Sequence, residues 1–403
     1  MKPMDFESAR EQFPALRDKV FLDAACVSLA PRAATEAIQE FLTMALECPA
    51  RSSTLHHIAM DEMRSRARPA AARLIHARED EIALVESTTH GLSLAAQAIP
   101  LGTGDRVLLS DLEFIEVATP WLQMRERGIA IDLVPNRDGV VRPEDIAERM
   151  TPRTRVLAIS SVQWSNGYRS DLGSLGALCR ERGIWLVVDA IQQLGAFPLD
   201  VQATPVDILV CGGHKWLNAP FGCGILYIRS ERMPELRPPM AGYLSVEMPR
   251  GWGEYFQTPS ISPVGDFKFF HDAKRFETGG TANYGGAIGL AASIELIHAL
   301  GTAKIAEHIC QLTDHLIAGL RTLSVEQVTP PQPEHRSGIV TFSAGSAANN
   351  CALMERLLDQ KILVSVRYTS NVGGVRVSCH FYNNLDDLDR LLNALESCRS
   401  PRA

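Results

Sequence analysis

The sequence of 403 residues lacks the features that mark membrane, secreted and nucleic-acid-binding proteins. No apolar run is long enough to cross a bilayer, and the N-terminal segment MKPMDFESAREQF carries acids where a signal peptide would be apolar. The formal net charge of −7, with its basic residues scattered, argues against a nucleic-acid or anionic-membrane surface. These absences predict a cytoplasmic protein whose partner is neither a nucleic acid nor a membrane.

The nine cysteines include no CxxC pair, so neither a disulfide framework nor a zinc site is expected. Most lie in apolar stretches, such as Cys179 in a helical pattern and Cys211 in a strand, which is typical of reduced, buried thiols. His56 and His57 are adjacent, so their side chains point apart, and no third ligand is evident. No GxGxxG or Walker loop follows a strand, which argues against a nucleotide-binding protein. We therefore expect no metal site and no nucleotide site.

From residue 82 onward, short apolar strands alternate with helical patterns. Runs such as IWLVVDA and DILVCGG are apolar almost throughout, which is typical of parallel strands covered on both faces. Residues 232–275 interrupt this alternation with a stretch rich in Pro, Gly and aromatics, which we interpret as an excursion that covers a site or a subunit interface. We predict an α/β protein with a large domain at 16–285 and a smaller C-terminal α/β domain at 286–403, which residues 1–15 join.

A lysine at the end of a buried strand, in the stretch VDILVCGGHKWL at 206–217, is the centre of the predicted site. An ammonium group there loses hydration, and a chemical reason to accept that cost is a Schiff base, in which the neutral amine attacks an aldehyde. The preceding strand, IWLVVDA, ends in Asp189. Lys215 and Asp189 at the ends of successive strands fit a pyridoxal phosphate site, where the lysine holds the aldehyde and the acid keeps the pyridine nitrogen protonated.

Several further side chains are predicted at the C-terminal ends of strands, where ligands bind in sheets of this kind. With the lysine and the acid, they are Thr89, Phe114, Gln163, Asp189, His214 and Lys215. Ser87, Thr88 and Thr89 precede a helix, where hydroxyl groups and free backbone N–H groups bind anions such as a phosphate. A plain N-terminal cap is the alternative interpretation of these three residues.

Four motifs in order carry a family resemblance: a strand ending in D-x-x-Q, a G-x-H-K lysine box, the segment RFETGGT, and a terminal R-x-S-x-x-x-Y-N. Together they resemble the class V aminotransferase family of fold-type I pyridoxal phosphate enzymes, from about Phe21 to the C-terminus. The segments SVQWSNGYRSDL and GVRVSCHFYNN are most similar to its isopenicillin-N epimerase-like and cysteine desulfurase-like branch. The resemblance implies a mostly parallel seven-stranded sheet in the large domain, a pyridoxal 5′-phosphate cofactor, an amino acid substrate and a homodimer with shared active sites.

The resemblance also implies roles for individual residues. Lys215 would form the Schiff base and later move a proton, Asp189 would pair with the pyridine nitrogen, and Gln192 would reach the phenolic oxygen of the cofactor. Phe114 matches the residue that stacks on the pyridine ring. Arg376 would clamp the substrate carboxylate, which suits its planar bidentate fork.

The phosphate and the cofactor oxygen have their own implied ligands. His214, with Thr88 and Thr89, would hold the phosphate, and Thr281 would reach the phosphate of the neighbouring subunit. The extra glycine in RFETGGTAN leaves Thr278 as the alternative to Thr281. Either Gln163 or Trp164 replaces the usual polar contact near the cofactor oxygen, and the sequence leaves both open.

Departures from the family pattern bear on the reaction. Desulfurases usually have a histidine where this chain has Phe114, and a catalytic cysteine on the loop that reads SVRYTSNVGG here. Cys379 lies after Arg376 on a predicted strand, and Gly212 stands where a serine is common. The missing loop cysteine argues against a desulfurase. Transamination is the first prediction, with β-elimination by a C–S lyase second and epimerisation third; a catalytically silent binding or scaffold protein is the non-enzyme alternative.

Overall fold

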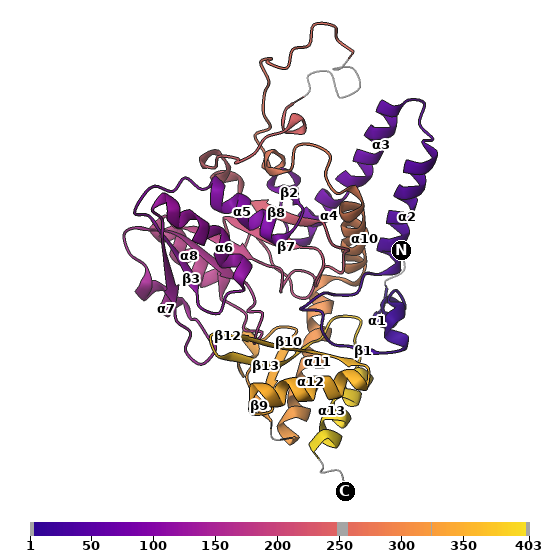
Figure 1. The fold of residues 1–403 in the computed structure, drawn as a ribbon, viewed down its shortest axis with the longest axis vertical. Coiled ribbons are helices and arrows are strands. Elements are labelled where there is room, and N and C mark those ends of the chain that lie inside the picture. The colour runs from indigo at the N-terminus through magenta and orange to yellow at the C-terminus, as the bar shows by residue number, and fades with distance from the viewer. Residues whose placement is uncertain (1–3, 248–256, 324, 400–403) are drawn as a thin grey trace.

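The computed structural model describes residues 4–247, 257–323 and 325–399. Its centre is a seven-stranded sheet with the strand order β2-β8-β7-β6-β5-β3-β4, seen edge-on beneath the helices in Figure 1. The five strands from β7 to β4 run parallel, and β8 is antiparallel to both of its neighbours. The mostly parallel seven-stranded sheet is thus confirmed. Its strands are β2 (Ile82–Val85), β3 (Arg106–Ser110), β4 (Ala130–Val134), β5 (Thr154–Ser160), β6 (Trp185–Asp189), β7 (Ile208–Gly212) and β8 (Gly224–Ile228).

The near-continuous apolar strands are explained by two separate cores, one on each face of the sheet. In β6, Leu186 and Val188 pack into one core, while Trp185 and Val187 pack into the other. Since successive side chains of a strand point to opposite faces, a strand covered on both sides needs apolar residues at every position. The one polar side chain of β6, Asp189, accordingly lies at the end of the strand.

Helices cover both faces of this sheet, and α2 and α3 project beside it as a pair (Figure 1). α5 packs against β7, and α10 packs against α2, α3 and α4. The helices of this part are α2 (Arg32–Glu47), α3 (Ser53–Ser65), α4 (Ala67–Leu74), α5 (Thr88–Ala98), α6 (Ile115–Gln123), α7 (Pro143–Arg149), α8 (Leu172–Arg182) and α10 (Tyr284–Leu300). The predicted boundary at 285 falls in the first turn of α10, and the division into two domains stays a prediction.

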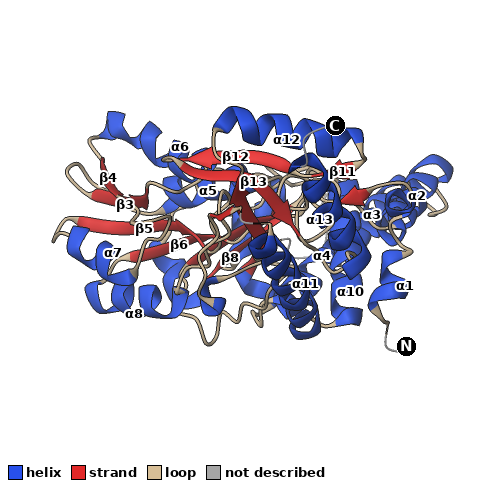
Figure 2. Ribbon diagram, turned by 90° about the horizontal axis from the view of Figure 1, so that it is seen from below, coloured by secondary structure: helices blue, strands red, loops and turns tan. Residues whose placement is uncertain are grey.

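A second, smaller α/β layer lies at the C-terminal end of the chain (Figure 2). Its antiparallel sheet has the order β12-β13-β10-β9, and its third core lies between this sheet and its helices. The elements are α11 (Thr302–Thr322), β9 (Glu326–Gln327), β10 (Ile339–Ser343), α12 (Ala347–Asp359), β12 (Ser365–Thr369), β13 (Val372–Ser378) and α13 (Leu385–Arg399). The N-terminal segment joins it: β1 (Val20–Phe21) pairs with β11 (Ile362–Leu363), and Arg10 of α1 (Phe6–Arg10) forms a 2.7 Å ion pair with Asp387.

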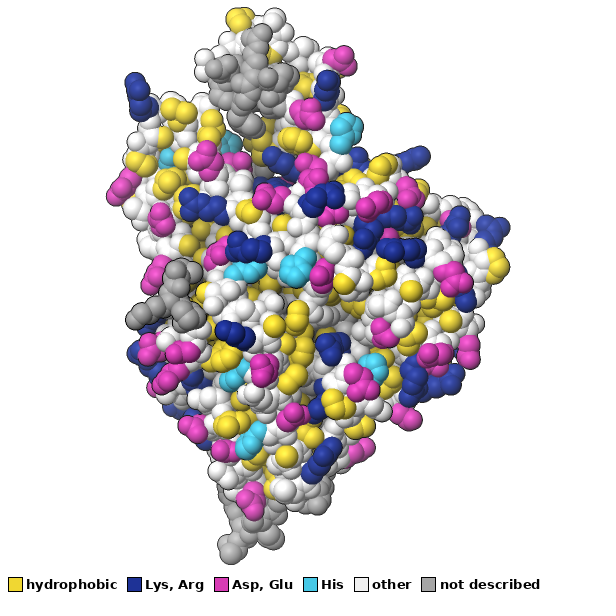
Figure 3. Space-filling model, turned by 180° about the vertical axis from the view of Figure 1, so that it is seen from behind, with side chains coloured by type: hydrophobic (Ala, Val, Ile, Leu, Met, Phe, Trp, Pro, Cys, Tyr) yellow, Lys and Arg dark blue, Asp and Glu magenta, His cyan; other side chains and the backbone are white. Residues whose placement is uncertain are grey.

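The predicted excursion has little regular structure in its described part. Residues 229–247 and 257–283 contain short 3-10 helices, and residues 248–256 lie outside the described residues. Charged side chains of both signs are interspersed on the face shown in Figure 3. Within the described chain, no single helix is long and apolar enough to cross a membrane, although α10 and α11, bent by 77° at their junction, pass on length and composition when taken together.

Only residues 48–52 separate α2 from α3. α3 already begins at Ser53, because the Ser52 side chain accepts a hydrogen bond from the backbone N–H of Leu55 and caps the helix. His57 therefore lies on a helix, with Nε2 3.2 Å from the Tyr284 hydroxyl. Among the residues that the structure describes, no group of His, Cys, Asp or Glu is arranged to hold a metal ion.

Candidate active site

Lys215 follows β7 after the turn Gly212–Gly213 and reaches the ring of Phe114, with Nζ 5.7 Å from the ring centroid. Burial lowers the pKa of Lys215, while the negative charges of Asp189 and Glu116 oppose this effect. A buried lysine with a lowered pKa has a larger share of neutral amine at physiological pH, which is the form that attacks an aldehyde.

Asp189 ends β6 at the same edge of the sheet. Its side chain is buried, and Oδ1 accepts a hydrogen bond of 2.9 Å from the backbone N–H of Ile191. Burial raises the pKa of Asp189 to about 8, with a further contribution from Glu116, and the nearby Lys215 opposes the rise. Such a carboxyl needs a positively charged partner to remain ionised at neutral pH, and the protonated nitrogen of a pyridine ring is one.

Gln192 is buried between the site and the N-terminal loop. Its Nε2 donates to the carbonyl of Ala25 at 3.0 Å, and its Oε1 accepts from Trp216 Nε1 at 2.7 Å. The backbone N–H of Ser28 also donates to the carbonyl of His214 at 2.9 Å. The loop 23–28 is therefore held against the lysine turn.

Gln163 and Trp164 have different surroundings. Gln163 is buried, its Nε2 donates to Glu113 Oε1 at 2.9 Å, and its Oε1 has no hydrogen-bond partner among the described residues. Trp164 instead packs edge-on against Phe114, with ring centroids 5.0 Å apart at 71°. Trp164 is thus the member of the pair that borders the stacking aromatic ring.

Glu113 was missed by the sequence reasoning, although it directly precedes Phe114. Its carboxylate is buried and accepts hydrogen bonds from the backbone N–H of Ser160 at 2.9 Å, from the Ser160 hydroxyl at 2.5 Å and from Gln163. Burial raises the pKa of Glu113 to about 7. Glu113 thus links the segment after β3 to the end of β5. The sequence does not indicate this contact, because an acid after a strand has many possible partners.

The N-terminus of α5 forms the predicted phosphate side. Ser87 caps the helix by accepting from the N–H of His90, and the Thr88 hydroxyl accepts from the N–H of Gly212 at 3.0 Å. Thr89 is exposed, and its hydroxyl donates to Glu116 at 2.9 Å. The N–H groups of Thr88 and Thr89 lie in the first turn, where the helix offers them no acceptor. The cap interpretation is thus confirmed for Ser87, and the anion interpretation of the serine–threonine run stays a prediction.

His214 and Gly212 complete this side. The imidazole of His214 stacks on Phe221 at 4.8 Å, and burial, followed by the charge of Lys215, lowers its pKa to about 4. A Cβ atom at Gly212 would lie 2.7 Å from the Thr88 hydroxyl and 3.3 Å from His214 Nδ1. A serine there would require the Thr88 hydroxyl to move, so glycine preserves the close approach of the two predicted phosphate ligands.

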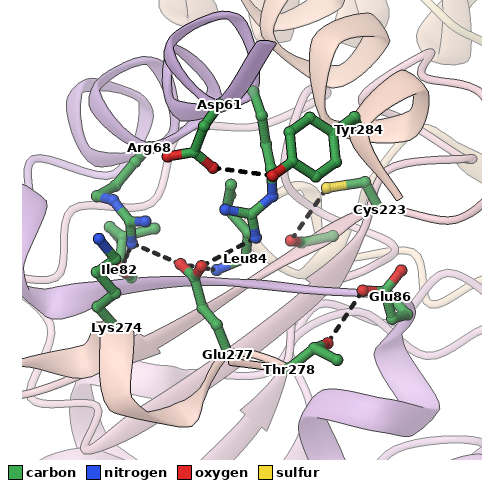
Figure 4. Close-up of polar contacts among 12 residues, drawn as sticks. Asp61, Arg68, Ile82, Leu84, Glu86, Cys223, Lys274, Glu277, Thr278 and Tyr284 are labelled. Carbon is green, nitrogen blue, oxygen red and sulfur yellow. Dashed lines mark hydrogen bonds and ion pairs between the residues drawn. The ribbon is translucent and has the colours of Figure 1, made fainter. Parts of the chain in front are cut away.

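Figure 4 shows how the segment RFETGGT is anchored. Glu277 is buried and forms ion pairs with Arg68 at 2.7 Å and Arg64 at 2.9 Å, and it accepts from the N–H of Leu84. The hydroxyl of the next residue, Thr278, donates to Glu86 at 3.2 Å, whereas Thr281 is exposed. Thr278 is thus engaged within its own chain, and Thr281 is the one of the two that is open to another molecule.

Arg376 lies on β13 and is almost fully buried, with 1% of its surface exposed. Its Nη2 pairs with Asp23 at 3.1 Å and its Nη1 donates to the carbonyl of Trp164 at 2.9 Å, while Nε has no partner among the described residues. Burial lowers the pKa of Arg376, and Asp23 opposes this. A carboxylate ligand would suit this guanidinium, because Asp23 contacts only Nη2 and a second negative charge would further stabilise the buried cation.

Cys26 and Arg367 are two further residues that the sequence reasoning did not place in the site. Arg367 Nη2 lies 3.3 Å from Cys26 Sγ, and joins β12 to the N-terminal loop. The loop SVRYTSNVGG forms the tight hairpin of β12 and β13, whose turn is at Ser370 and Asn371, and it carries no cysteine. No local pattern in the sequence indicates this contact, because the two residues are 341 positions apart.

These residues fit pyridoxal phosphate. A buried acid and a buried lysine meet at one sheet edge, an aromatic pair lies beside the lysine, and a helix N-terminus with hydroxyl groups lies next to them. The donor set matches a pyridinium nitrogen, an aldehyde, an aromatic ring and a phosphate, respectively. Lys215 and Asp189 would hold the reactive part of the cofactor, with Thr88, Thr89 and His214 at its phosphate.

The chain is similar to known proteins along nearly its whole length. The family model described as aminotransferase class-V matches residues 20–391. A cysteine desulfurase of Escherichia coli O7:K1 is 30% identical over 97% of both chains. The apo structure of a cysteine desulfurase from Thermococcus onnurineus NA1 has a TM-score of 0.85 at 27% identity, and each chain is covered to 97%. A C-DES mutant with glycine covalently linked to its pyridoxal phosphate cofactor has the same fold, with a TM-score of 0.85 at 24% identity over 96% of this chain and 98% of that one.

Proposed function

Because the chain belongs to the class V aminotransferase family of pyridoxal phosphate enzymes, we propose that it is a lyase that breaks the bond between the β-carbon and the sulfur of a cysteine-type amino acid. The observation that carries this proposal is full-length similarity to proteins named cysteine desulfurase. It favours the C–S-cleaving alternative of the sequence prediction over transamination, which had been placed first.

The cofactor supplies one part of the chemistry: when bound, pyridoxal phosphate withdraws electron density from the α-carbon of the amino acid. Lys215 would hold the cofactor and, as a neutral amine, take the proton from the α-carbon. The burial that lowers the pKa of Lys215 supports this role, because it favours the form that accepts a proton. Asp189 would keep a proton on the pyridine nitrogen by supplying the matching negative charge.

The substrate carboxylate would bind at Arg376. Its guanidinium is oriented by Asp23 and by the carbonyl of Trp164, and its Nε remains available. The Phe114–Trp164 pair would form an apolar wall on one side of the reacting atoms and exclude water from them. This arrangement would fix the amino acid at its carboxylate and leave its β-substituent to the loop 23–28.

We also propose that the enzyme is a homodimer in which Thr281 binds the phosphate of the partner subunit's cofactor. Two features support this proposal. Thr281 is exposed on a segment that Glu277 anchors. The surrounding excursion and the α2–α3 pair also expose large apolar side chains, namely Leu42, Leu46, Leu55, Met240, Tyr243, Ile261, Val264 and Phe269.

The experiment is to incubate the purified holoenzyme with L-cysteine and to measure sulfur release, alanine, pyruvate, ammonia and keto-acid formation. We expect sulfur release with alanine or pyruvate, and a fall of about 1000-fold or more in Lys215→Ala, which should also lose the visible absorbance of the bound cofactor. Lys304→Ala, an exposed lysine on α11, is the matched control and should keep both. Amino-group exchange with a keto acid and no sulfur release from any cysteine-type substrate would overturn the proposal in favour of transamination.

A further inference from the structure

We propose that Cys26 is the thiol that receives the sulfur atom when the C–S bond breaks. This inference rests on the proposed function and deepens it, since it names the fate of the sulfur. It is carried by the placement of the thiol among Lys215, Arg367 and Arg376.

The backbone holds Cys26 firmly in the N-terminal loop. Its N–H donates to the carbonyl of Asp23 at 3.0 Å, so the chain turns at this point. The flanking residues are tied to the cofactor side, since the carbonyl of Ala25 accepts from Gln192 and the N–H of Ser28 donates to the carbonyl of His214. The thiol is therefore fixed relative to the lysine turn and does not depend on a mobile segment.

The electrostatic surroundings favour sulfur that carries negative charge. Arg367 Nη2 lies 3.3 Å from Sγ, and a guanidinium in hydrogen-bond contact stabilises an attacking thiolate. The same loop contacts the two groups that would hold the amino acid. The N–H of Ser28 donates to the carbonyl of His214, which directly precedes Lys215, and Asp23 pairs with Arg376 Nη2 at 3.1 Å, so Cys26 lies between these two contacts along the loop.

An independent feature of Arg376 indicates that an anion belongs beside it. Its side chain is almost fully buried, yet its Nε has no hydrogen-bond partner among the described residues. Buried donors are nearly always paired, so this atom is expected to meet a ligand. An amino acid whose carboxylate occupied Arg376 and whose amino end reached Lys215 would lie beside Cys26.

The other cysteines offer no alternative in the described structure. Cys179, Cys211, Cys223 and Cys379 are buried, and burial raises their pKa values, which keeps them protonated and unreactive. The remaining ones are exposed or half-buried at the ends or outer faces of helices, namely Cys48, Cys310, Cys351 and Cys398. Among the described residues, none of these four forms a hydrogen bond with Lys215, Arg367 or Arg376.

The step balances without an external oxidant. The Cys26 thiolate attacks the sulfur of the bound cysteine, a sulfur–sulfur bond forms, and the bond between Cβ and sulfur breaks with its electron pair kept by Cβ, which then takes up a proton. The net change is cysteine plus Cys26 thiol giving alanine plus Cys26 persulfide. Two molecules of an added low-molecular-weight thiol then complete the cycle: the first displaces the outer sulfur as sulfide and forms a mixed disulfide with Cys26, and the second releases Cys26 as its thiol, so that the two added thiols end as a disulfide.

The test is a single turnover of the holoenzyme with L-cysteine in the absence of added thiol, followed by digestion and mass analysis of the peptide that contains Cys26. We expect one alanine per site and a Cys26 peptide heavier by one sulfur atom. Cys26→Ser should lower alanine formation by about 100-fold or more, whereas Cys351→Ser, an exposed cysteine on α12, should match the wild type. Substrate binding, followed by the change in visible absorbance, should persist in Cys26→Ser and show that the variant folds.

Two results distinguish the failures. If the wild type cleaves cysteine but releases free sulfide with pyruvate and ammonia, leaves the Cys26 peptide unmodified and matches Cys26→Ser in rate, the role of Cys26 is overturned while the lyase stands. If the wild type releases no sulfur at all, the proposed function itself is overturned.

A second readout needs no bound cofactor. The rate at which iodoacetamide alkylates Cys26 should fall several-fold in Arg367→Gln and be largely retained in Arg367→Lys, because only the former removes the positive charge beside the sulfur. Equal alkylation rates in wild type and Arg367→Gln would contradict the assigned electrostatic activation.

Discussion

The two halves of the candidate site differ in how much of their structure a single chain provides. We call them the ring side, formed by Phe114, Asp189, Gln192, Lys215 and Arg376, and the phosphate side, formed by Thr88, Thr89, His214 and Thr281. The acid, the amide and the guanidinium of the ring side are buried. Asp189 accepts a hydrogen bond from the nearby Ile191, whereas Gln192 and Arg376 are hydrogen-bonded to distant parts of the same chain. On the phosphate side, Thr89 and Thr281 are exposed.

This difference indicates which substitutions should have the largest effects on stability and activity. Removing one partner of a buried polar pair leaves the other unpaired in a low-dielectric environment, which costs several kcal/mol. Removing an exposed hydroxyl costs only the contact that it makes with its ligand. The ring side should therefore tolerate change much less than the phosphate side.

The largest effect is expected for Arg376→Ala, which removes a buried cation from Asp23 and from the carbonyl of Trp164. We expect kcat/KM for the amino acid to fall by about 100- to 1000-fold, corresponding to about 3–4 kcal/mol, with a lowered Tm. Arg376→Lys should recover only part of the loss, because an ammonium keeps the charge but cannot form the bidentate contact. If steady-state kinetics of Arg376→Ala match those of the exposed control Arg125→Ala, the ring side does not bind the carboxylate as proposed.

A smaller effect is expected for Asp189→Asn, and this substitution should raise the stability of the cofactor-free protein at high pH. Burial raises the pKa of Asp189 to about 8, so its ionisation opposes folding: its stabilising contribution is complete below its ordinary range and is lost as pH rises through about 8. The cofactor-free wild type should thus lose about 2–3 kcal/mol of stability between pH 6 and pH 9 relative to Asp189→Asn, whose side chain does not titrate.

The same substitution should weaken cofactor binding, because asparagine cannot supply the negative charge that pairs with a protonated pyridine nitrogen. Thermal unfolding at several pH values and titration with pyridoxal phosphate check the two parts separately. If the stability of the wild type and of Asp189→Asn changed with pH in the same way, Asp189 would not be the titrating group.

The smallest effect is expected on the phosphate side, for Thr281→Val. The loss of one hydrogen bond to a charged phosphate corresponds to about 1.5–3 kcal/mol, so the affinity for pyridoxal phosphate should fall by roughly 10- to 100-fold without a change in Tm of the cofactor-free protein. Thr278→Val is the matched control, since it removes the contact with Glu86 inside the same chain and should leave cofactor affinity nearly unchanged. A larger loss of affinity in Thr278→Val than in Thr281→Val would reverse the assignment.

The strand-end positions of Lys215 and Asp189 could be predicted from the sequence because they follow from local patterns. An apolar run defines a buried strand, and the first polar residues after it must lie at the sheet edge. The same reasoning placed Phe114 and the Ser87–Thr89 run, and the family resemblance added Arg376. These residues could be predicted because each belongs to a local strand or helix pattern or to a family motif.

Contacts between segments far apart in the chain could not be predicted in this way. Gln163 donates its amide to Glu113, which lies in the loop after β3, whereas Trp164 packs against Phe114. Thr278 donates to Glu86, whereas Thr281 is exposed. Local sequence does not show which partner a polar side chain will find, because any of several residues could satisfy it.

The amino-acid sequence by itself determined the α/β class, the lysine and acid at successive strand ends, and the absence of a cysteine in the hairpin that precedes Arg376. Only the tertiary structure decided that Cys26 meets Arg367, a residue 341 positions away, beside the predicted reaction centre. The physical reason is that hydrophobic periodicity fixes each element separately. The packing of the N-terminal loop against β12 and the lysine turn brings the thiol and the guanidinium together.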